Sequence, residues 1–498
     1  MELNKSIIAS LENKCILVTG STGFLAKLFV EKILRTQPNV KTLYLLIRAT
    51  DAASATRRLH DEVTSKEIFK VIKETYGDKF NSFMSEKLIP VAGDTSLENL
   101  GIGDAKMREK IFRDVDVVVN FAATTKFNER YDFALGTNTL GPKNILDFSK
   151  KCVKLEMLLH VSTAYVCGEK AGLILEDPYK MGETLNRIKT VLDIEMEKKV
   201  IEQKLEELRA KQLSKKEETK AMKELGLESG ARMFGWPNVY VFTKAMGEMP
   251  IGQWRENLPI VIIRPTIVTS TIKEPFPGWV ESVKTVDSYF VGFVQGKIAS
   301  FLGKSKTIMD VIPGDMVVNA TIAAMLAHED QPNSRFMIIY QVGSSNRKPM
   351  YCSMIKDYAY NHFVNNPLMS KNGEPIKVVK PYHFTSTNSL QRYTDLKYNL
   401  PLKGLRLAYA ILRHDDGGFC NDMERQLKFV TKLAKLNEPY LVFREGTFDD
   451  SNTEKLRISV KSNVKEENIF YFDPESINWD NYFMNIHLPG LMTYVLNN

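Results

Sequence analysis

The chain has 498 residues, 44% of them hydrophobic, which is enough for one large α/β domain and a smaller second domain with its own core. Lysine and arginine number 67 against 60 aspartate and glutamate, and no long basic run concentrates the formal net charge of +7. This balance argues against nucleic-acid binding and suits anionic small molecules or a membrane surface.

Targeting and metal-binding patterns are scarce. The opening MELNKSIIASLENKC contains acidic residues and few apolar ones, so it predicts neither a secretory signal nor a transit peptide. No stretch reaches the roughly 18 apolar residues that a spanning helix needs. The five cysteines are scattered without a CxxC pair, and the seven histidines show no HExxH spacing. We therefore expect a protein that is not secreted and holds no metal, acting on the cytoplasmic side, either free or attached peripherally to a membrane such as the endoplasmic reticulum.

Apolar runs rich in β-branched residues recur along the first 270 residues, and charged or amphipathic segments separate them. The runs are CILVTG, LYLLIR, KLIPVAGD, VDVVVNFAA, MLLHVSTAYV and IVIIRPTIV. Near-continuous apolar strands that alternate with helices are typical of a parallel sheet covered on both faces. The pattern predicts a doubly wound, Rossmann-type α/β domain.

The first strand runs into a glycine turn, VTGSTGFLAKLFVEKIL. Gly20 permits a tight turn, and Gly23 lets the backbone approach a pyrophosphate lying on the N-terminus of the next helix. Ala26 is small enough for close packing of that helix on the strand. A plain tight turn is the alternative, but the position at the first strand–helix junction favours a nucleotide.

Arg48 follows the second strand, where an NAD enzyme often carries an acidic residue for the ribose 2′-hydroxyl. A cation there accepts the 2′-phosphate of NADP, with Arg57 or Arg58 as a helper, so NADPH is favoured over NADH. An ordinary strand-end arginine is the alternative. Further cofactor contacts are expected at the ends of the third and fourth strands, from Asp94, Asn120 and Ala122.

A densely charged segment at about residues 187–230 interrupts the alternation of strands and helices. Its apolar residues Ile201, Leu205 and Leu208 recur at helical spacing, which predicts a solvated helical hairpin with one apolar stripe. A basic interaction surface is the alternative.

Tyr240 and Lys244 in WPNVYVFTKAMGE are four residues apart, so on a helix they share one face. A lysine ammonium near a phenol lowers a pKa that is normally about 10, which lets the tyrosine exchange a proton near neutral pH. A hydroxyl from Thr163, or from its neighbour Ser162, would bind the developing alkoxide while a nicotinamide gives hydride. YxxxK alone is common by chance; after a glycine turn, a strand-end arginine and VST it indicates a reductase.

Three strand-end residues carry weaker signals. Arg264 ends the IVIIRP strand, where it could contact the cofactor or shape the loop, and these alternatives are about even. His160 is expected to pack beside its strand. Asp315 in DVIPGDMVVNA is expected near a helix N-cap in a structural role.

The strand–helix alternation stops near residue 345. We place a boundary there, between a reductase domain at 1–345 and a mainly helical domain at 346–498. The run from Leu402 to Phe443 predicts amphipathic helices, and an aromatic-rich tail follows.

Several motifs resemble known proteins. TGSTGFLA, HVSTAYV and YVFTK resemble the extended short-chain dehydrogenase/reductases. NFAATTKFNERYD, HVSTAYVCGEK, GWPNVYVFTKAMGE, KEPFPGWVES and DDSNTEKLR are more narrowly similar to the alcohol-forming fatty acyl-CoA reductases of the plant type. The resemblance covers nearly the whole chain.

The resemblance implies site residues at matching positions. Thr163, counted back from AYVCG, would be the catalytic hydroxyl, Tyr240 the proton donor, and Lys244 its partner and a ribose contact. The implied cofactor contacts are Gly20, Thr22, Gly23, Phe24, Leu25 and Arg48. Two departures are Ala26 in place of a third glycine and the lack of the hydrophobic C-terminal segment that animal members carry, which leaves membrane attachment open.

The implied reaction reduces a long-chain fatty acyl-CoA twice with NADPH, through an aldehyde, to a primary alcohol. The C-terminal helices and the aromatic tail would line or cover the acyl pocket, although plain core packing is the stronger alternative for these residues. Rival predictions are an epimerase or a reductase that stops at the aldehyde, a non-catalytic nucleotide-binding scaffold, and a docking protein built on the charged segment. Chain length and oligomeric state stay open.

Overall fold

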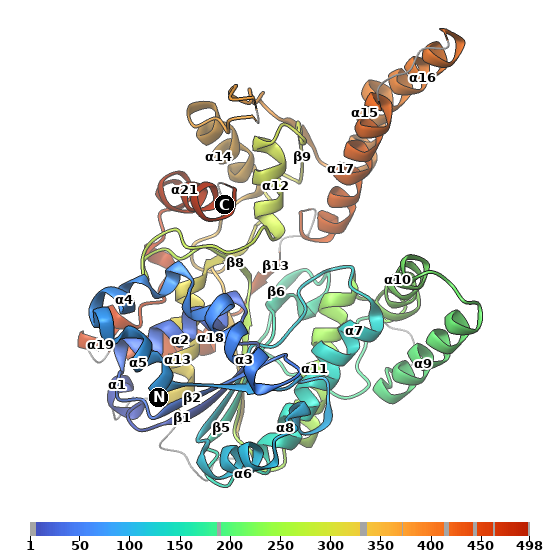
Figure 1. The fold of residues 1–498 in the computed structure, drawn as a ribbon. Helices are drawn as coiled ribbons and strands as arrows, with labels where there is room; N and C mark the ends of the chain where they lie inside the picture. The colour runs from blue at the N-terminus through green and yellow to red at the C-terminus, as the bar shows by residue number, and fades with distance from the viewer. Residues whose placement is uncertain are drawn as a thin grey trace.

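The computed structural model describes residues 6–186, 191–328, 336–370, 372–412, 418–441, 446–461 and 464–496 (Figure 1). Seven parallel strands form its main sheet in the order β11-β7-β5-β4-β1-β2-β3. Their bounds are β1 Cys15–Thr19, β2 Thr42–Ile47, β3 Leu88–Ala92, β4 Val117–Asn120, β5 Met157–Val161, β7 Ile260–Pro265 and β11 Met337–Val342. The six predicted strands are confirmed, and β11 is a seventh that the sequence analysis missed.

Side chains alternate between the two faces of the sheet. Ile16 and Val18 of β1 enter one apolar core, whereas Cys15 and Leu17 enter the other. The helices α2 (Phe24–Thr36), α13 (Gly314–Leu326) and α18 (Ser451–Lys461) cover the first face. Those that cover the second are α6 (Ala105–Asp114), α8 (Gly141–Ser149) and α11 (Val239–Trp254). The predicted doubly wound fold is therefore confirmed, with its switch point between β1 and β4.

Shorter helices fill the connections in this domain. They are α1 Ile7–Ser10, α3 Ala52–Leu59, α4 Lys70–Tyr76, α5 Phe80–Lys87 and α7 Tyr131–Leu135. The connection that leaves β2 carries most of them, so the strand end bearing Arg48 lies beside α3.

The charged segment forms a helical hairpin that projects beside α7 and α11 (Figure 1). It consists of α9 (Ile194–Ala210) and α10 (Lys215–Glu224). Ile201 and Leu208 are each 4% exposed, and they pack with Leu205 against the core around Tyr131. The predicted hairpin with one apolar stripe is confirmed; residues 187–190 of the segment lie outside the described residues.

The later part of the chain interleaves with elements that precede residue 345. β12 (Tyr382–Phe384) pairs with β9 (Ser300–Leu302), and α14 (Cys352–Asn365) packs on α12 (Thr285–Val294). β13 (Gly446–Phe448) pairs with β6 (Gly172–Ile174). A further short pair, β8 (Ile267–Thr269) with β10 (Val311–Pro313), lies wholly before residue 345. The boundary at 345 stays a prediction.

Three helices form an arm, which points away from the sheet in Figure 1: α15 (Thr387–Thr394), α16 (Leu400–Leu412) and α17 (Phe419–Leu441). The predicted amphipathic helices between Leu402 and Phe443 are thus confirmed within the described residues. The remaining helices are α19 Val464–Ile469, α20 Trp479–Asn481 and α21 Leu488–Leu491. Tail aromatics such as Tyr482 and Phe483 are buried in the core, so the tail is core and not a lid.

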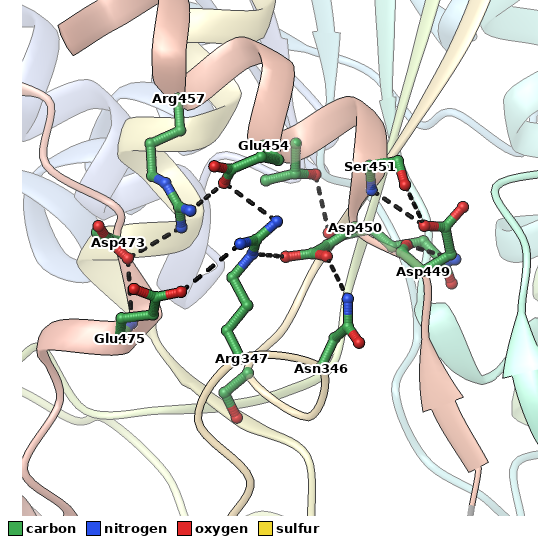
Figure 2. Close-up of polar contacts among 12 residues, drawn as sticks. Asn346, Arg347, Asp449, Asp450, Ser451, Glu454, Arg457, Asp473 and Glu475 are labelled. Carbon is green, nitrogen blue, oxygen red and sulfur yellow. Dashed lines mark hydrogen bonds and ion pairs between the residues drawn. The ribbon is translucent and has the colours of Figure 1, made fainter.

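Charged side chains join α18 to the loop after β11 (Figure 2). Nε of Arg347 lies 2.5 Å from Asp450, and its Nη2 lies 3.2 Å from Glu454. On the same helix Arg457 pairs with Asp473 at 2.9 Å. The DDSNTEKLR segment therefore closes the sheet edge at β11.

Candidate functional site

The glycine turn has the shape that the sequence analysis expected. Gly20 has a φ of +66°, and a Cβ there would lie 2.6 Å from the backbone nitrogen of Ala122. Gly23 is the N-cap of α2 and supplies no side-chain cap, so within the described structure the first N–H groups of α2 are available to an anion. Thr22, Phe24 and Leu25 are half-buried around this turn.

Arg48 and Asp94 meet at the ends of β2 and β3. Nε of Arg48 lies 2.8 Å from the Asp94 carboxylate, and the Arg48 side chain is 51% exposed. Arg58, by contrast, is bound to Glu62 at 2.5 Å and to the Arg48 carbonyl. Arg48 therefore remains accessible at this edge, Arg57 of α3 is also exposed, and Arg58 supports the backbone of Arg48.

Asn120 is buried and joins three strand ends. Its Oδ1 accepts from the Thr19 hydroxyl at 2.7 Å and from the Ala122 amide at 3.0 Å. Its Nδ2 donates to Nδ1 of His160 at 2.8 Å, and burial lowers the pKa of His160, so that ring is neutral. Asn120 thus holds the loop against Gly20, and His160 packs in the core as expected.

The structure brings Thr163 and Tyr240 together. Thr163 follows β5, and its hydroxyl lies near enough to the Tyr240 side chain on α11 to affect the pKa of the phenol. Lys244, one turn after Tyr240, is 1% exposed and donates to the Val161 carbonyl at 2.7 Å. The neighbouring Ser162 has a buried hydroxyl without a hydrogen-bond partner among the described residues. This geometry favours Thr163 over Ser162.

Burial dominates the protonation of this pair. It raises the pKa of Tyr240 to about 12, although the nearby Thr163 hydroxyl opposes the rise. Burial also lowers the pKa of Lys244 to about 8, opposed by Glu248. Burial and Thr163 account for the shift in the phenol pKa, so the expectation that Lys244 lowers that pKa stays a prediction. At neutral pH the phenol is therefore protonated, the form that can donate a proton.

An ion pair fixes α11 to the sheet. Arg264 of β7 donates to both oxygens of Glu248, at 3.1 and 2.6 Å, and to the Asp177 carbonyl at 2.9 Å. The two side chains of the pair are 2% and 1% exposed. Because these bonds occupy the guanidinium, the loop-shaping role of Arg264 is favoured over cofactor contact.

Asp315 has the expected structural role near a helix N-cap. It is the second residue of α13, whose N-cap is Pro313. Its carboxylate accepts backbone N–H groups of Ile272, Lys273 and Glu274 at 2.8 to 2.9 Å. The expectation of a structural role near a helix N-cap is therefore confirmed, and the aspartate also caps a neighbouring loop.

Three further residues surround Tyr240. The Asn238 amide donates to the Tyr440 hydroxyl at 2.7 Å, and the Phe127 ring lies 6.0 Å from that of Tyr240 and 5.2 Å from that of Tyr440. Asn238 had a readable signal, since it is the N-cap of α11. Tyr440 had no such signal in the sequence, because only the tertiary fold brings α17 to α11.

An apolar cavity begins at Tyr440. It holds about 630 Å³ of atom-free space, its open mouth included. Its lining includes Val286, Tyr289, Phe301, Met309, Val430 and Leu433. No group of three or more His, Cys, Asp or Glu is placed to bind a metal within the described residues, and no helix there is long and apolar enough to cross a membrane.

Comparisons with known proteins identify the family. A family model described as "Male sterility protein" matches residues 18–321, and a second with this description matches 397–498. The alcohol-forming fatty acyl-CoA reductase of Simmondsia chinensis is 50% identical over 499 residues, covering 100% of both chains. The chain belongs to the fatty acyl-CoA reductase family.

Another member of the fatty acyl-CoA reductase family, fatty acyl-CoA reductase 1 of Arabidopsis thaliana, is 48% identical over 99% of this chain and 100% of its own. Membership makes the protein an oxidoreductase with a nicotinamide cofactor. Among solved structures, the reductase domain of a non-ribosomal peptide synthetase from Mycobacterium tuberculosis matches 98% of this chain and 96% of its own, with a TM-score of 0.56 and 16% identity. That likeness shows the fold alone.

Proposed function

We propose that this reductase converts a long-chain fatty acyl-CoA into the primary alcohol in two hydride steps through an aldehyde. The observation that carries the proposal is the placement of Thr163 beside Tyr240, with the apolar cavity beginning at the neighbouring Tyr440. The names of the relatives supply the acyl-CoA and the alcohol.

NADPH is the proposed cofactor, and it supplies hydride when bound. The cradle formed by Gly20 and the uncapped start of α2 fits a pyrophosphate, since a Cβ at position 20 would collide with Ala122. The accessible guanidinium of Arg48 supports recognition of a 2′-phosphate. Lys244, buried beside β5, would hold a ribose hydroxyl.

The chain's own residues polarise the substrate and move one proton. Thr163 and Tyr240 would donate hydrogen bonds to the carbonyl oxygen in both steps, which stabilises the negative charge that develops there. The first hydride leaves a tetrahedral oxyanion, which collapses to the aldehyde and expels CoA as its thiolate, and the thiolate takes a proton from water. After the second, the phenolic proton of Tyr240 passes to the alkoxide. A phenol with a pKa near 12 is fully protonated beforehand.

We also propose peripheral contact with the cytoplasmic face of a membrane such as the endoplasmic reticulum, through α16. Leu400, Leu407 and Ile411 of this helix are 56%, 62% and 71% exposed, an apolar surface of the kind that enters a lipid interface. Vesicle flotation of the whole protein with a Leu407→Glu/Ile411→Glu variant tests this. Equal flotation of both proteins would count against it.

Product analysis tests the main proposal. Purified protein is incubated with NADPH and saturated acyl-CoAs of increasing chain length, and products are identified by gas chromatography. Primary alcohol with two NADPH consumed per CoA released is expected, and Tyr240→Phe should lose roughly 10² to 10⁴ in rate. Aldehyde alone would favour the reductase that stops there, and no product with any chain would favour the scaffold.

A further inference from the structure

A second groove, lined by both charged and apolar side chains, meets the apolar cavity at Tyr440. The groove holds about 1640 Å³ of atom-free space, its open side included, and lies between the arm and the start of α11. Phe127 and Asn238 form its inner end, and both contact Tyr440. The groove therefore ends beside Tyr240, where the cavity begins.

The helix α17 divides the groove from the cavity. Residues 428, 431, 432 and 435 line the groove, and residues 430, 433, 434 and 437 line the cavity. Each set recurs at spacings of three or four, so the two sets lie on different faces of one helix. The groove face carries three lysines beside the apolar Leu427 and Leu436, and the cavity face is mainly apolar.

The groove has an excess of positive charge. Its cations are Arg232, Lys403, Arg406, Lys428, Lys432 and Lys435, against the carboxylates Asp395 and Glu424. Glu424 is occupied by Arg406 at 2.7 Å and Lys428 at 2.6 Å. Asp395 accepts from the side-chain amides of Gln391 and Asn399. Lys403, Lys432 and Lys435 have no ion pair within the described structure, so they are available to an anion.

We propose that this groove binds the phosphates of coenzyme A, so that α17 separates the nucleotide head of the substrate from its acyl chain. The phosphates lie on Lys403, Lys432 and Lys435, and the chain fills the apolar cavity. This inference rests on the proposed function, because it assumes an acyl-CoA substrate.

The dimensions of α17 allow this arrangement. At about 1.5 Å per residue, Lys435 and Lys432 precede Tyr440 by roughly 8 and 12 Å along the helix. The pantetheine arm of coenzyme A is about as long as five extended residues, roughly 17 Å. With its phosphates held near these lysines, the arm is therefore long enough to bring the thioester to Tyr440 and its neighbour Tyr240.

Charge reversal with a matched control tests the groove. The variant Lys432→Glu/Lys435→Glu is compared with Arg425→Glu, which reverses a charge on the same helix at a residue that does not line the groove and is 80% exposed. The measured quantity is the ratio of kcat/KM for acyl-CoA to kcat/KM for the matching acyl-pantetheine, which lacks the phosphates. The lysine variant should lower this ratio roughly ten- to hundredfold, through KM, whereas Arg425→Glu should leave it unchanged.

Binding of adenosine 3′,5′-bisphosphate, measured by calorimetry, separates this inference from the proposed function. The wild-type protein and Arg425→Glu should bind it, and the lysine variant should not. If the wild type reduces acyl-CoA but the ratio does not change in the lysine variant, the inference is overturned and the proposed function stands. If the wild type reduces neither substrate, the proposed function fails. If the lysine variant loses only binding to anionic vesicles, the groove is a membrane surface and the inference is also overturned.

Discussion

Around α18, charged groups are buried and tied to several partners, whereas on the arm they are exposed. Asp450 is 9% exposed and Arg457 8%, while Arg406 and Glu424 of the arm are 43% and 35% exposed. The ion pairs around α18 join segments that are separated in the sequence, whereas the Arg406–Glu424 pair joins two helices of the arm. The same kind of bond is therefore made under two very different degrees of desolvation.

This difference shows how one molecule can hold its sheet in a fixed arrangement while its arm is held by weaker bonds. Buried, multiply bonded charges are costly to separate, so α11 and α18 keep the sheet and its strand ends fixed. Exposed pairs contribute little, so the arm can shift at small cost to admit a long chain. The following predictions test that contrast, from the largest expected effect to the smallest.

Removal of one partner of the buried pair on α11 should have the largest effect. Glu248→Ala leaves the Arg264 guanidinium buried without its carboxylate, which costs about 3–5 kcal/mol. Thermal unfolding should show a fall of several degrees in Tm. Glu248→Gln, which keeps a hydrogen-bond acceptor, should fall less. Equal Tm values for Glu248→Ala and the wild type would show that the pair does not anchor α11.

Loss of Arg347 should have the next largest effect. Arg347→Ala removes the cation between Asp450, Glu454 and Glu475, and the partly buried carboxylates then repel one another. We expect about 2–3 kcal/mol of destabilisation. Arg347→Lys keeps the charge without the planar fork and should lie between, because it cannot bond several carboxylates at once. A lysine variant as unstable as the alanine variant would show that fork geometry matters more than charge.

Glu176, which bonds both β11 and the start of α18, should make the free energy of unfolding depend on pH. Its carboxylate accepts hydrogen bonds from the backbone N–H groups of Gln341 and Asn452, yet burial raises its pKa to about 7. The folded protein then binds more protons than the unfolded chain between about pH 4.5 and 7, so the stabilisation from this group is complete below 4.5 and is lost as pH rises through 7. For a partly exposed side chain we expect about 1–2 kcal/mol. The difference in Tm between wild type and Glu176→Gln, followed across this range, should therefore change; parallel curves would refute the shift.

The arm should tolerate the loss of its ion pair. Arg406→Ala should change stability by about 0–1 kcal/mol, because both charges are largely hydrated. Amide hydrogen exchange should also be faster in α17 than in α18. An Arg406→Ala protein as unstable as Arg347→Ala would remove the contrast between the two regions.

Much of the sheet was readable because its strands are uninterrupted apolar runs. β11 was missed, since the excursion through α12 and the paired short strands breaks the rhythm before MIIYQV. Gln341 in this strand also looks like a loop residue, but its amide donates to the Ile174 and Asp449 carbonyls. A polar residue inside a strand was explained only by partners distant in the sequence.

Some features of the candidate site could likewise be predicted from the sequence, and others could not. The spacing of Tyr240 and Lys244 on one helical face, and the glycine turn, follow from local geometry and could be predicted. The high pKa of Tyr240 could not, because it depends on burial by segments such as α17. The roles of Asn238 and Tyr440 likewise needed the tertiary contact between α11 and the arm.

β11 also sets the order in which the protein can finish folding as it leaves the ribosome. It emerges only at residues 337–342, and α18, which covers it, begins at residue 451. Until β11 emerges, β7 is an unpaired sheet edge, and its side chains from Ile260 to Ile263 are wholly apolar. The nascent chain thus presents a strand edge that can pair with another copy until β11 covers it.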